Sequence, residues 1–158
     1  MNFHIKIQCF KLGKKNCENA KVHKNLTFQF TIHYDELMMS YGTKVNISLV
    51  AKNESTADPI MAFMLTAYDQ YGINFGRFVE DQRYLLSVSC ENLGPEALTN
   101  PYSALMNAGP LVMKEINSQW VAESKVQDEP VRVYFYLTLI LPEHTVWIKK
   151  HVATLHVV

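Results

Sequence analysis

The side chains that most often perform chemistry in proteins are dispersed along this chain. It has six histidines, and the two closest in sequence, His151 and His156, are five residues apart. On a strand this spacing places two side chains on opposite faces, whereas metal ligands lie two residues apart or converge from neighbouring strands. The sequence therefore predicts no metal site.

The acidic residues and short motifs give no sign of catalysis either. Glu80-Asp81 and Asp128-Glu129 are adjacent pairs in turn-like segments, whereas a general acid and a general base must converge across a cleft. No GxSxG, HExxH, P-loop or GxGxxG pattern occurs. We therefore expect a protein that is not an enzyme and needs no cofactor.

Aromatic and cationic side chains on loops and strand ends are better candidates for function. Aromatic faces can stack on sugar rings or anchor protein partners, and Arg or Lys can bind phosphate or sulfate. In β-sandwich domains, recognition surfaces lie in such places. The candidate ligand-binding residues are Tyr68, Tyr71, Arg77, Trp147 and Lys149, with Tyr102 and Lys150 of the same kind. For Tyr68 and Trp147, the alternative role is packing in the core or at its rim.

The three cysteines, Cys9, Cys17 and Cys90, leave the cellular compartment open. Outside the cytoplasm an odd number indicates one disulfide and a spare thiol, or a link to another chain. In the cytosol, all three would be ordinary buried thiols. Three N-x-S/T sequons begin at Asn25, Asn46 and Asn53. They predict surface glycosylation if the protein is secreted.

Size and charge argue against two classes of partner. The chain has 158 residues, of which 48% are hydrophobic, as expected for one domain with a substantial core. Fifteen basic residues balance fifteen acidic residues, so the basic excess typical of nucleic-acid-binding proteins is missing. No apolar run approaches the roughly 18 residues that a transmembrane helix needs.

Residues 1–24 are polar and lysine-rich, and we expect an amino-terminal arm there, followed by one domain over residues 25–158.

Hydrophobic alternation predicts strands through much of the chain. Residues 26–33, 45–51 and 131–141 alternate in the manner of strands with one buried face. In residues 45–51 this phase places Asn46 and Ser48 outward. In residues 131–141 it places Val131, Val133, Phe135, Leu137 and Leu139 on one face, and Arg132, Tyr134, Tyr136, Thr138 and Ile140 on the other.

The remaining segments complete an all-β pattern. The short apolar run Ile60 to Ala67 favours a strand that is covered on both faces, with one or two more strands before Cys90. Gly-Pro and Asn-Pro pairs divide residues 91–117 into loops around one short strand at 111–116. The last strands are expected at 146–148 and 152–158. Seven to nine short strands separated by loops predict an antiparallel immunoglobulin-like β-sandwich.

Several segments resemble, in order, those of one known family. Tyr41-Gly42-Thr43 before an alternating strand resembles a Tyr-x-Pro-Gly turn without its proline. Residues 60–67 resemble an F-x-G-F-x-x-x-A strand, with Ala62 in place of the glycine. Further segments of this family resemble three others here: Gly76-Arg77-Phe78, residues 97–100 and residues 119–122. Together, residues 17–158 resemble the reeler domain, the extracellular β-sandwich of reelin, F-spondin and some insect defence proteins.

The resemblance implies a secreted, non-enzymatic binding module. The family pairs a cysteine of the amino-terminal segment with the one at the position of Cys90, which implies a Cys17–Cys90 disulfide and a spare Cys9. Its single-domain members imply innate immune recognition of microbial polysaccharide or lipopolysaccharide. One alternative is an extracellular matrix or cell-surface domain that binds an extracellular protein. Another is an intracellular structural subunit with reduced cysteines and unused sequons.

Overall fold

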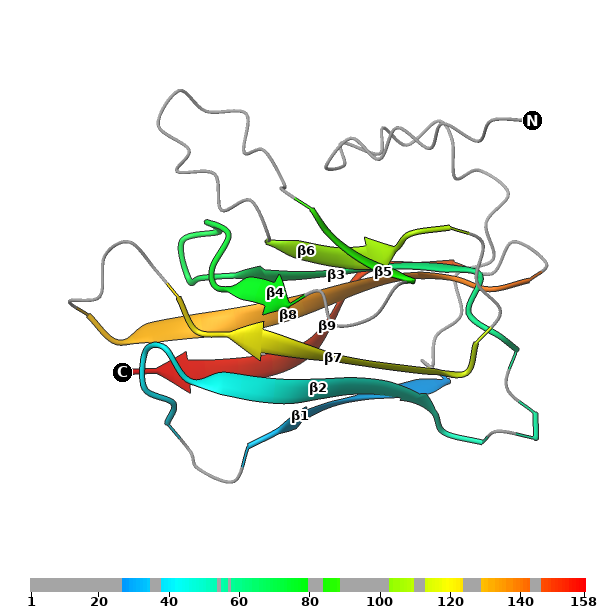
Figure 1. The fold of residues 1–158 in the computed structure, drawn as a ribbon, viewed down its shortest axis with the longest axis horizontal. Helices are drawn as coiled ribbons and strands as arrows, with labels where there is room; N and C mark the ends of the chain where they lie inside the picture. The colour runs from blue at the N-terminus through cyan, green and yellow to red at the C-terminus, as the bar shows by residue number, and fades with distance from the viewer. Residues whose placement is uncertain are drawn as a thin grey trace.

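A computed structural model describes residues 27–34, 38–53, 55–56, 58–79, 84–88, 103–109, 113–123, 129–142 and 146–158. Their regular elements are nine strands arranged in two layers (Figure 1). The strands are β1 (Phe28–His33), β2 (Lys44–Ala51), β3 (Ala62–Tyr68), β4 (Arg77–Val79), β5 (Leu85–Val88), β6 (Ala104–Asn107), β7 (Glu115–Val121), β8 (Val131–Ile140) and β9 (Val146–Val157). This confirms the predicted all-β antiparallel sandwich.

Each layer is an antiparallel sheet. One contains four strands in the order β1-β2-β7-β4, and the other contains five in the order β5-β6-β3-β8-β9. All seven strand pairs are antiparallel. The inner faces of the two sheets pack against each other, which leaves each sheet with one outer face.

Alternation along β2 and β8 builds much of the core, as predicted. Val45, Ile47, Leu49 and Ala51 of β2 are buried, and so are Val133, Phe135, Leu137 and Leu139 of β8. Val131 is half-buried against the same core. β-branched and aromatic side chains fill a pleated, half-buried surface well, and this explains why these two segments are strands.

The central stretch forms three strands, β3, β4 and β5, at the upper end of the predicted number. Phe63, Leu65 and Ala67 of β3 face the core and are buried. On the opposite face Thr66 is also buried, whereas Met64 is only half-buried. The expected cover on both faces is therefore partial.

Two regions differ from the sequence-based prediction. Residues 104–107 form β6, paired with both β3 and β5, in a segment that was expected to be a loop. The strand expected at 111–116 instead begins at Glu115 and continues to Val121 as β7. The last two predicted strands form a single strand, β9. β9 contains bulges, which can bend a strand without ending it.

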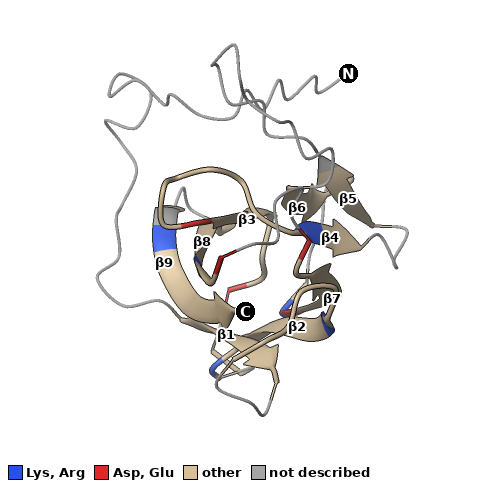
Figure 2. Cartoon of the chain, turned by 90° about the vertical axis from the view of Figure 1, so that its left-hand side faces the viewer, with Lys and Arg blue, Asp and Glu red and all other residues tan. Residues whose placement is uncertain are grey.

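Charged residues are scattered over the described part of the chain (Figure 2). The described residues form no helix long and apolar enough to span a membrane. The proposed arm of residues 1–24 lies outside the described residues.

Candidate functional site

The candidate ligand-binding residues whose side chains the structure describes do not form one site. Tyr68 is the last residue of β3 and is half-buried, and Tyr71 lies in the following turn with 74% of its surface exposed. Arg77 begins β4 in the other sheet. The side chain of Lys149 lies outside the described residues.

Trp147 is a core residue, so the prediction that it binds a ligand is wrong. Only 4% of its surface is exposed, and it packs in the central hydrophobic cluster. It lies opposite Leu139 in the β8–β9 pair, on the inner face of the sheet. A ring in this position has no face for a sugar or a protein partner.

Arg77 is held by a carboxylate of its own chain. Its Nε donates a hydrogen bond to Oε2 of Glu123 at 2.7 Å, and the two side chains are 37% and 45% exposed. In Figure 2 the blue segment of β4 is Arg77. An ion pair this exposed contributes little to stability. It does, however, neutralise the positive charge of Arg77 that would attract a phosphate or sulfate group.

Four rings on the outer face of the five-stranded sheet form a continuous group, which we call the aromatic strip: Tyr68, Tyr134, Tyr136 and His151. The ring centroids are 5.9 Å apart for Tyr68 and Tyr136, 5.7 Å for Tyr136 and His151, and 5.9 Å for Tyr134 and His151. The three tyrosines are half-buried and His151 is exposed. Their accessible ring surfaces therefore lie together on three neighbouring strands.

Strand register explains why these rings meet. Tyr68 lies opposite Tyr134 in the β3–β8 pair, and Tyr136 lies opposite His151 in the β8–β9 pair. Side chains that are directly opposite or diagonal on one face of a sheet are within reach of each other when they are aromatic.

A β-bulge places His151 on the aromatic strip. The register passes from Phe135 opposite Ala153 to Tyr136 opposite His151, so Val152 is an extra residue in β9. Val152 and Ala153 both pack against the core, while Nε2 of His151 hydrogen-bonds Oγ1 of Thr154 at 2.9 Å on the outer side. The bulge turns the preceding side chain to the opposite face from the one that strict alternation predicts.

The same bulge corrects the prediction for the two histidines of β9. His156 lies opposite Arg132, whose side chain is exposed on the outer face, so His151 and His156 lie on the same face rather than on opposite faces. No group of three or more potential metal ligands occurs among the residues that the structure describes.

The sequence contained part of the signal for this strip. Alternation along residues 131–141 already places Tyr134 and Tyr136 outward, two residues apart, on the face of β8 that does not enter the core. Two outward tyrosines at this spacing form an aromatic row on one face of the strand. The contribution of His151 had no such signal because it depends on the bulge.

The outer face of the four-stranded sheet is polar and has one feature that resembles a catalytic pair. Nε2 of His33 hydrogen-bonds Oγ of Ser48 at 2.9 Å, beside an open groove of about 420 Å³ that Asn46, Asn117 and Gln119 help to line. Ser48 therefore faces outward as predicted but is only 8% exposed. No carboxylate of a described residue hydrogen-bonds His33, so within the described part of the chain the pair has no third group of the kind that activates a serine nucleophile.

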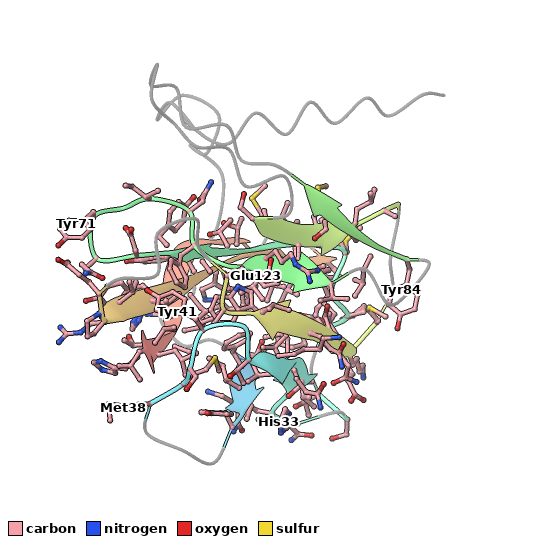
Figure 3. The ribbon with its side chains drawn as sticks, turned by 60° about the vertical axis from the view of Figure 1, so that its left-hand side comes forward. His33, Met38, Tyr41, Tyr71, Tyr84 and Glu123 are labelled. Atoms are coloured by element: carbon pink, nitrogen blue, oxygen red, sulfur yellow. The ribbon has the colours of Figure 1, made fainter. Side chains whose placement is uncertain are left out.

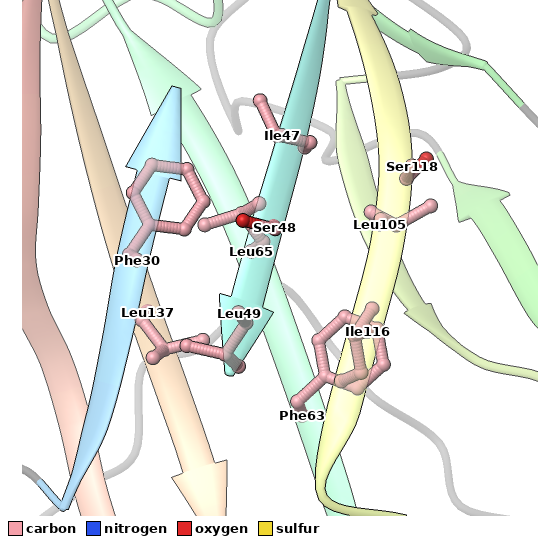
Figure 4. Close-up of a pocket in the computed structure, with 10 residues that line it drawn as sticks. All are labelled: Phe30, Ile47, Ser48, Leu49, Phe63, Leu65, Leu105, Ile116, Ser118 and Leu137. Atoms are coloured by element: carbon pink, nitrogen blue, oxygen red, sulfur yellow. The ribbon is translucent and has the colours of Figure 1, made fainter. Parts of the chain in front are cut away.

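The cavity between the described strands of the two sheets is very small. The space between the sheets holds a cavity of about 10 Å³, lined mainly by apolar side chains (Figure 4). That volume corresponds to a single water molecule at most. This cavity is therefore too small for a sugar or a peptide.

The asparagines of two of the three sequons lie in the described part of the chain. Asn46 is exposed in the middle of β2, where its Oδ1 accepts a hydrogen bond from Nε2 of Gln119 at 3.0 Å. Asn53 is exposed in the turn after β2, and its Oδ1 accepts hydrogen bonds from N and Oγ of Ser55 at 3.1 and 2.7 Å. Asn25, Cys9, Cys17 and Cys90 lie outside the described residues.

Known structures share this fold at low sequence identity. The reelin-N domain of F-spondin matches with a TM-score of 0.62 and 14% identity, over 89% of this chain and 92% of that one. A human F-spondin reeler domain matches with a TM-score of 0.61, again at 14% identity and the same coverage. A cohesin module from a Clostridium perfringens family 33 glycoside hydrolase gives a TM-score of 0.50 at 9% identity, over 84% and 96% of the two chains.

Comparisons with protein-family models and with curated proteins give no match. The structural matches therefore establish the fold alone: this chain has the fold of the reeler domain.

Proposed function

We propose that this protein is a secreted, non-enzymatic binding module that holds a microbial surface polysaccharide, or the glycan part of a lipopolysaccharide, on the aromatic strip. The observation that carries the proposal is the row of three tyrosines and His151 with adjacent centroids 5.7 to 5.9 Å apart. Sugar rings present apolar C–H faces, and aromatic rings are the side chains best suited to cover them.

The tilt of the rings favours a single flexible chain as the ligand. Tyr136 and His151 are inclined to each other by 59°, and Tyr68 and Tyr136 by 64°. Rings at these angles do not form one plane, so a flat crystalline polysaccharide surface could touch only some of them. A soluble chain can instead turn from ring to ring.

Substitution of the central ring tests the proposal. We expect Tyr136→Ala to weaken polysaccharide binding about tenfold, equivalent to roughly 1.4 kcal/mol, because it removes the ring that touches both Tyr68 and His151. Binding would be measured by calorimetry against soluble lipopolysaccharide, soluble β-glucan and a heparin-like polymer.

Tyr84→Ala is the matched control for this experiment. Tyr84 is 39% exposed, stands outside the strip just before β5 (Figure 3), and should be replaceable without effect on binding. Thermal unfolding of both variants separates lost contacts from lost fold. Equal affinities for wild type and Tyr136→Ala, or no binding to any of the three polymers, would contradict the proposal.

The extracellular part of the proposal has its own test. We infer that the secreted protein contains a Cys17–Cys90 disulfide with a free Cys9, and glycans at Asn25, Asn46 and Asn53. Intact mass before and after reduction and enzymatic deglycosylation should therefore show one disulfide, one thiol and removable glycan mass, part of which Asn53→Gln abolishes. Three thiols and unmodified sequons in protein from its native source would instead favour the intracellular structural subunit.

A second candidate function is an extracellular protein-interaction domain. It is favoured by a different surface, at the end of the sandwich, where exposed apolar side chains surround a groove.

A further inference from the structure

Exposed apolar side chains gather at the end of the sandwich where β8 begins and β9 ends. Tyr71 is 74% exposed, Met38 58% and Ile73 49%, which are three of the highest values among large hydrophobic residues in the described part of the chain. Figure 3 shows Tyr71 and Met38 at the same end of the molecule. Apolar side chains exposed together in this way commonly mark an interaction site.

A groove of about 430 Å³, which we call the end groove, opens at this surface. Met38, Gln70, Val131, Arg132 and His156 are among the residues that line it. Its lining is thus partly apolar and includes a guanidinium and an imidazole. Gln70 joins it to Tyr71, the next residue along the turn.

Hydrogen bonds fix the turn that presents Tyr71. Oδ1 of Asp69 accepts from the backbone N–H groups of Tyr71 and Ile73, each at 2.8 Å. Oε1 of Gln70 accepts from the backbone N–H of Arg132 at 2.9 Å, which ties the turn to β8. A large aromatic side chain on a fixed turn loses little conformational freedom on binding, and this favours affinity.

The charges at the end groove favour an anionic group in the ligand. Arg132 is exposed and makes no ion pair with any described residue. His156 lies opposite it in the β8–β9 pair. Two carboxylates stand nearby, but Asp69 uses one oxygen for the two turn amides, and Glu129 is exposed beyond Pro130.

We propose that the end groove binds a peptide segment of a partner protein in which an apolar side chain lies close to an aspartate or glutamate. The apolar side chain packs against Met38 in the groove, the carboxylate meets the guanidinium of Arg132, and Tyr71 contacts the peptide beyond Gln70. Tyr, Met and Arg are among the residue types enriched at protein interfaces, and Tyr and Arg are among those that contribute most to the energies of such contacts. This surface is separate from the binding of polysaccharide on the aromatic strip, so either can fail without the other.

A peptide-display selection on the folded domain tests the proposal. Selection of a random peptide library should enrich sequences that combine a large apolar residue with a nearby Asp or Glu. We expect Tyr71→Ala and Arg132→Glu each to weaken the selected peptides about tenfold or more in fluorescence anisotropy. A peptide with its acidic residue changed to lysine should recover affinity for Arg132→Glu, because the reversed charges restore the pair.

Lys44→Glu is the matched control, since it reverses an exposed cation on the other sheet and should leave peptide binding unchanged. Thermal unfolding confirms that each variant is folded. The proposal is overturned if no sequence is enriched, if the selected peptides bind Arg132→Glu as well as wild type, or if the charge swap restores nothing. Loss of heparin-like polymer binding in Arg132→Glu, without any peptide binding, would assign the groove to an acidic glycan instead.

Discussion

Gly76→Ala is expected to destabilise the domain by at least about 3 kcal/mol, because steric conflict and backbone strain add at one position. Gly76 has a φ of 70°, in the left-handed region that favours glycine. A Cβ there would overlap the indole ring of Trp120 and lie 2.6 Å from the carbonyl oxygen of Val121. Trp120 is fully buried and Val121 is held in β7, so neither can move aside easily.

Two other glycines separate the steric effect from the backbone effect. Gly42 and Gly72 have φ values of 80° and 79°, but a Cβ at either would meet nothing within 4 Å. Alanine at these positions should cost only the backbone strain, about 1 kcal/mol. Urea unfolding of the three variants gives the comparison. A loss for Gly76→Ala no larger than that for Gly42→Ala would show that the strand end of β7 can adjust.

The pattern of apolar residues was sufficient to predict the sandwich because one buried face per strand leaves a period of two in the sequence. The clearest cases are β2 and β8, whose inward residues were all identified. β6 escaped prediction because its four residues are too few to show a period, and prolines lie in the segment that precedes it. The long β9 was divided in two because its bulges interrupt the alternation.

The candidate site was only partly predictable, for the same physical reason. Tyr68 was identified, and the outward direction of Tyr134 and Tyr136 followed from alternation alone. The place of His151 depends on one extra residue, Val152, and a bulge of this kind has no local sequence signal. The burial of Trp147 could not be predicted because an aromatic residue near a strand end can pack on either face. In the structure it lies opposite Leu139, a core residue of β8, and therefore faces the core.

Trp120→Ala is expected to cost about 3 to 5 kcal/mol of unfolding free energy, as for other large buried aromatic residues. The indole has no exposed surface and contacts Phe135 edge-on, with ring centroids 5.1 Å apart. Its second aromatic neighbour is Phe75, at 6.3 Å. Removal of the ring would leave a cavity between the two sheets that neither neighbour can fill.

Trp120→Phe should cost less than half as much, because it keeps an aromatic ring and sacrifices no hydrogen bond. Nε1 of Trp120 is buried and has no hydrogen-bond partner among the described residues, so the indole N–H is a desolvated donor whose removal offsets part of the lost packing. Urea unfolding of both variants measures the difference. A Phe variant as unstable as the Ala variant would mean that the N–H is satisfied after all, for example by a buried water.

The phenylalanine should also relieve the conflict at Gly76. Of the two indole atoms that a Cβ at position 76 would overlap, Cζ2 lies in the part of the bicyclic ring that the smaller phenyl ring vacates, whereas Cε2 lies close to where the phenyl ring itself sits. Gly76→Ala should therefore cost less in the Trp120→Phe background than in wild type, by about 1 kcal/mol or more. The relief is incomplete, because the carbonyl of Val121 remains. Strict additivity of the two substitutions would show that the backbone of β7, rather than the indole, is what excludes a side chain at this turn.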